Sequence, residues 1–160
     1  LISEILLLIK YENIFFNDLI ELKRYIEKHY IENDFQNKDA FLNYLIGEKL
    51  LAQNKIIEAM SYFNDVLKNY GKTSIIPETT FRLAQINQQL ENYEKSLSLL
   101  KTLENSILKS EAMVFSSEIT DRNLNRKIEA EKLYFQFLQD FPKSIYSEPV
   151  RYRLREIKGE

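Results

Sequence analysis

The side chains that could catalyse a reaction or bind a metal are one histidine, His29, and 24 acidic residues, because the chain has no cysteine. Zinc is usually held by three or four histidine, cysteine or carboxylate ligands, and His29 has no second histidine beside it. It lies between Lys28 and Tyr30 at the end of a predicted helix. We therefore expect His29 to be a surface or helix-end residue, and we expect no metal and no cofactor.

The acidic residues are spread along the sequence and predict solvated helix faces. Several precede a lysine by four residues, as Glu91 precedes Lys95, and such pairs stabilise exposed helices. The sequence has only three glycines and lacks phosphate-binding loops and the GxSxG and HExxH motifs of hydrolases. These features predict a protein that is not an enzyme. A cavity with several inward-facing acidic groups would instead favour a helical enzyme domain.

The overall charge gives no general attraction to nucleic acid or anionic lipid, because 22 basic and 24 acidic residues leave a net charge of −2. Basic residues are concentrated only near the C-terminus, at Lys143, Arg151, Arg153, Arg155 and Lys158. A solvated helix face explains this cluster, and a phosphate-binding patch is the alternative. The apolar run in residues 1–10 is too short to cross a membrane, so we predict an amphipathic helix there and no transmembrane segment.

The elements that position these side chains are predicted to be helices, because three glycines and three prolines leave few breaks. Leu42, Leu45, Ile46, Leu50 and Leu51 form one apolar stripe with helical spacing, and residues 56–67 contain a second. The same reading predicts helix pairs at 1–12 with 15–31, 38–52 with 55–70, 77–90 with 93–107 and 109–121 with 124–141. A single helix at 147–158 follows, and we expect one all-α domain over residues 1–160.

The sequence also repeats itself at a distance of 71 residues. Residues 66–83 and 137–154 share, without a gap, a leucine, an aromatic residue, a helix breaker, a lysine, a hydroxyl residue and an aromatic-Arg-Leu triplet. An ordinary globular domain has no need of such a repeat, whereas a stacked array of helix pairs does.

Small residues recur at a spacing that resembles the tetratricopeptide repeat, a unit of two helices and about 34 residues. The positions that carry the resemblance are Gly47, Ala59 and Phe63, then Ala84 and Ser96, then Ala130, Tyr134 and Pro142. Small side chains let two helices cross closely, so leucine at Gly47 or Ala59 is expected to overpack the crossing. Leu22 and Glu118 depart from the pattern. The resemblance implies a right-handed α-solenoid of about four helix pairs with a C-terminal helix.

A narrower resemblance concerns residues 137–146 followed by Tyr152, Arg153 and Leu154. These segments are similar to the bacterial envelope branch of the family, whose members act as scaffolds in outer-membrane assembly and with the Tol–Pal system. The resemblance implies a non-catalytic scaffold in the periplasm or on the periplasmic face of the outer membrane. A cytoplasmic helical adaptor is the alternative.

In this family the first helix of each pair lines a concave face that binds partner proteins or peptides. The corresponding residues here are Tyr44, Glu48, Phe81, Gln85, Gln88, Phe115 and Arg122. The alternative is that the three aromatic residues only pack between neighbouring helices. Tyr44 and Glu48 do not supply the clamp with which some relatives bind chaperone tails, so that ligand class is not expected.

Two further partners follow from the ends of the chain. Aromatic residues near both ends could allow self-association through the terminal helices, namely Tyr11, Phe15, Phe16, Tyr146 and Tyr152. The basic C-terminal helix could instead make the chain a nucleic-acid-binding regulatory module, although the net charge makes this the less favoured alternative.

Overall fold

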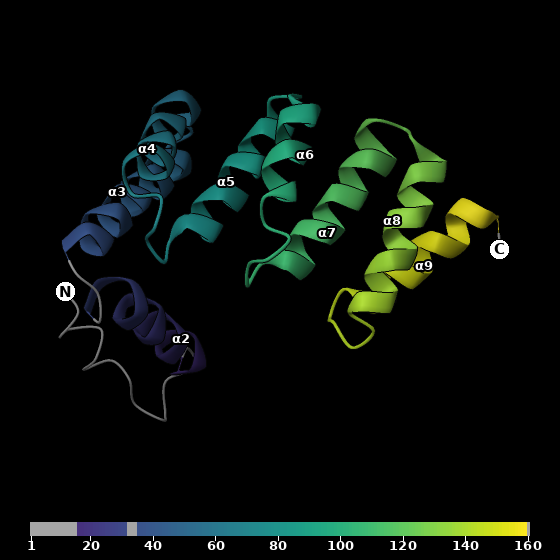
Figure 1. Ribbon diagram of the computed structural model, residues 1–160, viewed down its shortest axis with the longest axis horizontal. Helices are drawn as coiled ribbons and strands as arrows, with labels where there is room; N and C mark the ends of the chain where they lie inside the picture. The colour runs from purple at the N-terminus through teal and green to yellow at the C-terminus, as the bar shows by residue number, and fades with distance from the viewer. Residues whose placement is uncertain (1–15, 32–34, 160) are drawn as a thin grey trace. The chain divides into compact units, whose positions relative to one another are not determined.

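The computed structural model describes residues 16–31 and 35–159, and every regular element within these ranges is a helix (Figure 1). The elements are α2 (Phe16–Ile26), η1 (Glu27–Ile31), α3 (Phe35–Ala52), α4 (Ile56–Asn69), α5 (Ile76–Gln89), α6 (Tyr93–Lys101), α7 (Lys109–Glu118), η2 (Ile119–Asn123), α8 (Lys127–Asp140) and α9 (Ser147–Lys158). Two of them, η1 and η2, are π-helices. The predicted helix at 1–12 lies outside the described residues.

The chain divides into two compact units, Leu1–Ile76 and Pro77–Glu160, and each is considered by itself. Within the described residues, no helix is both long and apolar enough to cross a membrane. The largest departure from the predicted helix bounds is α6, which ends at Lys101 and not at residue 107. The Thr102 and Ser106 hydroxyls bond to the carbonyls of Leu99 and Leu103, and such local bonds compete with helix continuation.

The turns inside three successive helix pairs have the same backbone geometry. Asn54, Glu91 and Asn125 have φ angles of 59°, 61° and 53°, and they lie 37 and 34 residues apart. The next residue in each case begins a helix, and its carbonyl accepts a bond from the N–H of Ala59, Ser96 or Ala130 at 2.9–3.0 Å. Because Glu91 lies in a turn, it does not form the predicted helical ion pair with Lys95.

The 71-residue repeat is also a repeat of hydrogen bonds. The N–H of Tyr70 bonds to the Val66 carbonyl at 3.0 Å, and the N–H of Phe141 bonds to the Phe137 carbonyl at 2.8 Å. The turns that follow continue with corresponding bonds, from Thr73 to Tyr70 at 3.0 Å and from Ser144 to Phe141 at 3.1 Å. The next helices, α5 and α9, begin at positions that are again 71 residues apart.

Small residues lie where the helices of a pair meet. A Cβ atom on Gly47 would be 2.6 Å from Cε1 of Phe63, so α3 and α4 approach each other through the missing side chain. Ser96 donates a 2.7 Å hydrogen bond to the carbonyl of Ala84, which joins α6 to α5. Ala59, Ala84 and Ala130 are fully buried, whereas Pro142 is exposed in the turn after α8.

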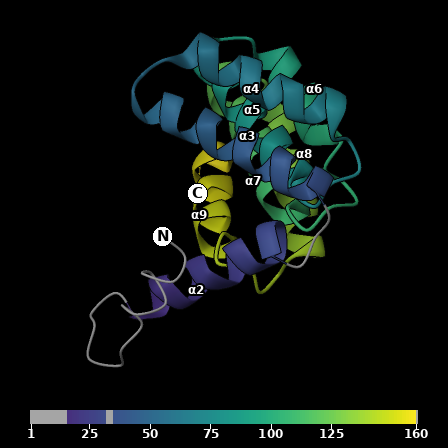
Figure 2. The same cartoon turned by 90° about the vertical axis from the view of Figure 1, so that its left-hand side faces the viewer.

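The side of α3 that packs inward differs from the apolar stripe seen in the sequence. Ala40, Phe41, Tyr44 and Gly47 are buried, while Leu42, Leu45 and Ile46 are 40–44% exposed. Figure 2 shows α3 crossing the side of its unit that faces the viewer. The helix is apolar on both sides, so periodicity alone could not identify the inward one.

His29 is buried, not a surface residue as the sequence suggested. Its side chain is 1% exposed at the centre of η1, and Nδ1 lies 2.8 Å from the Ser74 hydroxyl. The ring stacks on Phe41 with centroids 5.6 Å apart and meets the Tyr25 ring at 4.6 Å. The hydroxyl partner and the aromatic surroundings make burial of a neutral imidazole favourable.

We expect the burial of His29 to make stability depend on pH. Burial, with a smaller contribution from Lys28, lowers the pKa of His29 from 6.5 to about 4. Between these values the unfolded chain binds a proton that the folded chain does not, so stability is complete above pH 6.5 and falls as pH decreases toward 4. The pKa difference corresponds to about 3 kcal/mol at most.

Urea unfolding at pH 7.5, 5.5 and 4.5, followed by circular dichroism, tests this dependence. A His29→Phe variant should lose most of it, because phenylalanine cannot titrate. Parallel pH curves for the variant and the natural sequence would show that His29 does not carry the effect.

Candidate functional site: a groove beside a buried carboxylate

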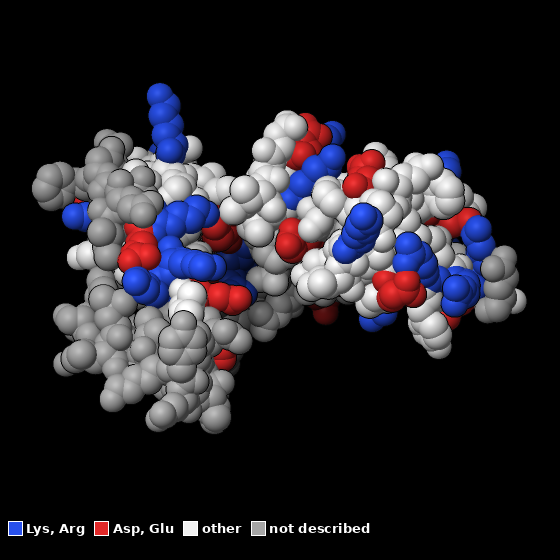
Figure 3. All heavy atoms as spheres, turned by 90° about the horizontal axis from the view of Figure 1, so that it is seen from below, with Lys and Arg blue, Asp and Glu red and all other residues white. Residues whose placement is uncertain are grey.

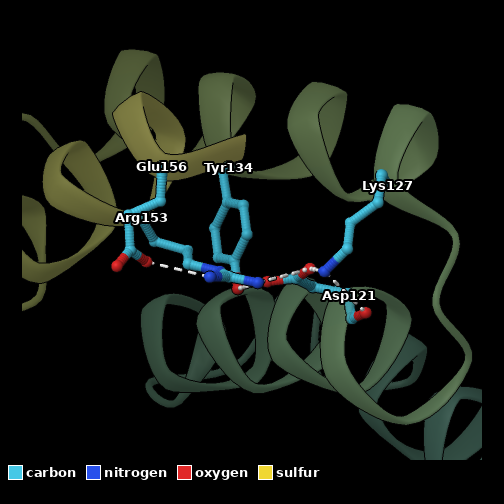
Figure 4. Close-up of polar contacts among 5 residues, drawn as sticks. All are labelled: Asp121, Lys127, Tyr134, Arg153 and Glu156. Atoms are coloured by element: carbon cyan, nitrogen blue, oxygen red, sulfur yellow. Dashed lines mark hydrogen bonds and ion pairs between the residues drawn. The ribbon is translucent and has the colours of Figure 1, made fainter. Parts of the chain in front are cut away.

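A completely buried carboxylate joins three elements of the C-terminal unit. Asp121 lies in η2, is 0% exposed, and accepts hydrogen bonds from Arg153 of α9 at 2.6 Å and 3.1 Å (Figure 4). Lys127 of α8 lies 2.5 Å from its other side, and the Tyr134 hydroxyl donates to it at 3.4 Å. The close-up shows all three donors converging on one carboxyl group.

The π-helix explains how an acidic residue comes to face inward. The N–H of Leu124 bonds to the carbonyl of Ile119, five residues earlier, which widens the last turn. Thr120 returns its hydroxyl to the Ser116 carbonyl, so the polar side chains of this turn are satisfied locally. Asp121 is then directed toward α8 and α9.

The donors keep Asp121 ionised. Burial alone would raise the pKa of Asp121, but hydrogen bonds from Arg153 and Lys127 outweigh it and lower the pKa to about 2. Arg153 is 24% exposed and also contacts Glu156 at 2.8 Å. Burial, together with the negative charge of Asp121, raises the pKa of the Tyr134 phenol, so this hydroxyl stays a hydrogen-bond donor.

A small cavity of about 80 Å³ adjoins this cluster. Its lining comes from α7, η2, α8, α9 and the turn before α9, and consists of Val114, Glu118, Arg122, Tyr134, Tyr146, Pro149, Val150 and Arg153. Burial raises the pKa of Glu118, the positive charge of Arg122 opposes that rise, and Asp121 adds to it. The cavity therefore combines an apolar wall with one carboxyl and two guanidinium groups.

The cavity continues into an open groove over the surface of α9. Arg122, Pro149 and Arg153 line both, and the groove adds Glu148, Tyr152, Arg155 and Glu156. Tyr152 is 64% exposed. Among the described residues, Arg122 forms no hydrogen bond or ion pair, whereas Arg153 is held by Asp121 and Glu156. We call the cavity and this surface together the α9 groove.

The structure separates the predicted partner-binding residues. Arg122 lines the α9 groove, while Phe81 and Phe115 pack against each other with ring centroids 5.7 Å apart. Gln85 accepts a 2.7 Å bond from Arg82, and Gln88 donates to Asn123 at 3.4 Å.

Tyr44 and Glu48 belong to the other compact unit. Tyr44 is buried, with its ring 5.6 Å from that of Phe63, and Glu48 is half-buried. The packing alternative therefore describes Tyr44.

The groove does not assemble a pair of acidic groups for acid–base chemistry. Glu118 lines the cavity, but Asp121 does not, and its oxygens are occupied by three donors. In the ranges that the structure describes, no group of three or more histidine, cysteine or acidic residues could hold a metal ion. What the groove offers is an unpaired cation beside apolar and aromatic surface.

The sequence reading missed Asp121, Lys127 and Arg153 as a unit. It placed the acidic residues on exposed faces and Arg153 in a solvated basic patch, and both expectations are wrong at these positions. A signal was present, because Asp121 follows Leu50 and Asn87 at the same 37- and 34-residue steps as the repeats. Asn87 is also fully buried, so this position of the repeat faces inward.

Comparison of the chain with protein-family models, with curated proteins and with solved structures finds no match.

Proposed function

We propose that the protein is a non-catalytic scaffold of the tetratricopeptide-repeat type, which binds a segment of a partner protein in the α9 groove. The observation that carries the proposal is Arg122, an exposed and unpaired guanidinium next to Pro149 and Tyr152. Arginine and tyrosine are enriched at the centres of protein interfaces, where they combine apolar contact with directed hydrogen bonds.

The repeat-like assembly is supported by the equivalence of successive helix pairs. Three turns share a left-handed residue at repeating distances, and two pairs meet through small residues. Each such pair exposes apolar surface that a neighbouring pair can cover, which is the physical basis of helical repeat arrays. A place in a bacterial cell-envelope assembly is the more specific proposal, and it rests on the resemblance of residues 137–146 and 152–154.

A nucleic-acid-binding function is less well supported by the contacts of α9. Arg151 pairs with Glu148, and Arg153 pairs with Asp121 and Glu156, so both guanidinium groups are already engaged. The surface drawn in Figure 3 shows basic and acidic side chains next to each other, with no broad area of one sign. Phosphate binding would weaken steeply between about 50 and 200 mM salt, so a salt titration distinguishes the two functions.

Reversing the charge of Arg122 tests the proposal. We expect Arg122→Glu to reduce recovery of the partner in an affinity pull-down at least tenfold, about 1.4 kcal/mol, because a carboxylate would replace the guanidinium at the interface. The helical circular dichroism signal should not change, since Arg122 makes no described contact that holds the fold.

The matched control is Arg24→Glu, which makes the same charge change at an exposed position of α2. Equal loss of the partner in both variants would indicate a nonspecific charge effect. Loss of helicity in Arg122→Glu would make this residue structural, and either outcome would contradict the proposal.

A further inference from the structure

The outward side of α3 carries four residues whose spacing is symmetric. Asp39, Leu42, Ile46 and Lys49 follow one another at intervals of three, four and three residues and are all exposed. Leu45 lies beside them and is 42% exposed. Apolar residues at alternating three- and four-residue intervals form the seam along which one helix packs against another. We call these five residues the α3 seam.

The opposite side of α3 is already used inside its own unit. Ala40, Phe41, Tyr44 and Gly47 are buried there, and Gly47 faces Phe63 of α4. A helix that is apolar on every side normally has both sides covered. The α3 seam is thus an apolar surface in excess of what the fold of this unit requires.

The order of residues along the α3 seam specifies what could cover it. The midpoint between Asp39 and Lys49 is residue 44, and the midpoint between Leu42 and Ile46 is the same residue. When a helix meets its own copy in antiparallel orientation about that midpoint, residue 39 faces residue 49 and residue 42 faces residue 46. Each acidic end then meets a basic end, and each aliphatic residue meets another.

We propose that the α3 seam is a two-fold interface at which a second copy of this chain binds. Such an interface is self-complementary, because both copies use the same surface. Neither Asp39 nor Lys49 forms an ion pair or side-chain hydrogen bond with another described residue, so both are available for the contact. Leu42 and Ile46 are 44% and 40% exposed and supply its apolar centre.

One helix side covers little area, so the association should be weak, in the range typical of small and transient interfaces. We expect a dissociation constant between about 10 μM and 1 mM, which lies in the range where binding free energies are about −4 to −7 kcal/mol. Sedimentation equilibrium of the 160-residue chain should therefore show a mass that rises from monomer toward dimer with concentration. A monomer at every concentration up to 1 mM would overturn the proposal.

Ile46→Glu tests the apolar centre of the seam. We expect it to weaken self-association at least tenfold, because two carboxylates would be buried near the two-fold axis. The matched control is Ile57→Glu, since Ile57 belongs to the same unit, is 71% exposed and lies on α4 outside the seam. Dimerisation that survives Ile46→Glu, or is lost equally in the control, would contradict the assignment.

Charge exchange tests the antiparallel pairing itself. Asp39→Lys and Lys49→Asp should each weaken the homodimer, because like charges would face each other at both ends. Mixing these two variants should restore association, since every facing pair is then of opposite charge, and the double variant should dimerise like the natural sequence. Failure of the mixture to associate more strongly than either variant alone would overturn the two-fold geometry, and circular dichroism checks that all variants remain helical.

Discussion

Replacing Asp121 by asparagine should reduce the free energy of unfolding by about 3 kcal/mol, the low end of the 3–5 kcal/mol typical when one partner of a buried ion pair is removed. The low end is expected because Arg153 and Lys127 are 24% and 44% exposed and can recover some hydration. Asparagine cannot balance two cations that converge on one buried group. Urea unfolding followed by circular dichroism measures the change.

The matched control for Asp121→Asn is Glu94→Gln. The Arg126–Glu94 pair has the same nitrogen–oxygen distance as the Arg153–Asp121 pair, 2.6 Å, but its side chains are 44% and 69% exposed. Exposed pairs contribute under about 1 kcal/mol, so the control should change stability little. Equal effects of the two substitutions would show that burial of Asp121 does not determine its contribution.

Asp121 also predicts an acid-sensitive contribution. Its folded pKa of about 2 is below the ordinary value of 3.8. The stabilisation is therefore complete above pH 3.8 and is lost as pH falls through 3.8 toward 2, where the folded carboxylate also takes a proton. This range is more acidic than the one in which His29 acts, so the two effects can be separated in one series of measurements.

Replacing Gly47 by leucine should reduce the free energy of unfolding by about 1–3 kcal/mol, the usual cost of overpacking. A Cβ atom at this position would lie 2.6 Å from Cε1 and 2.7 Å from Cζ of Phe63, and Phe63 is completely buried. The ring cannot move away without disturbing the contact between α3 and α4. Thermal and urea unfolding should both detect the loss.

A second substitution shows whether the contact with Phe63 is the cause. Adding Phe63→Leu to Gly47→Leu should cost less than the sum of the two single effects, because the smaller side chain relieves the overlap. The control is Gly71→Ala, where the added Cβ would meet only the Leu67 carbonyl at an ordinary 3.5 Å. Strict additivity of the double variant, or an equal loss in the control, would contradict this account of Gly47.

Much of the helical architecture could be predicted from the sequence, because hairpin turns and small residues leave local signals. The 71-residue repeat anticipated the corresponding turns after α4 and α8, and Gly47 and Phe63 meet as their spacing suggested. The resemblance to the tetratricopeptide repeat and the solenoid arrangement remain predictions. The same holds for the absence of catalysis and for the cellular location.

Other features depend on information that a periodic pattern does not contain. The residues of α3 are apolar on both sides, so the stripe through Leu42 and Ile46 could equally have faced inward. A π-helical turn such as η2 involves a single bond to the fifth preceding residue, and polarity alone assigns Asp121 to the surface. Its partners, Lys127 and Arg153, come from two later helices, and only the fold brings them together.

The account's main functional proposal, that a partner segment lies in the α9 groove, can be tested by site-specific photo-crosslinking in extracts of the native host cell. A photoreactive phenylalanine analogue at Tyr152, 64% exposed in the groove, should capture a discrete protein, and Arg122→Glu should abolish the adduct. The same analogue at Phe135, 55% exposed on α8 outside the groove lining, should not capture it. No adduct at Tyr152, or an equal adduct at both positions, would contradict the proposal.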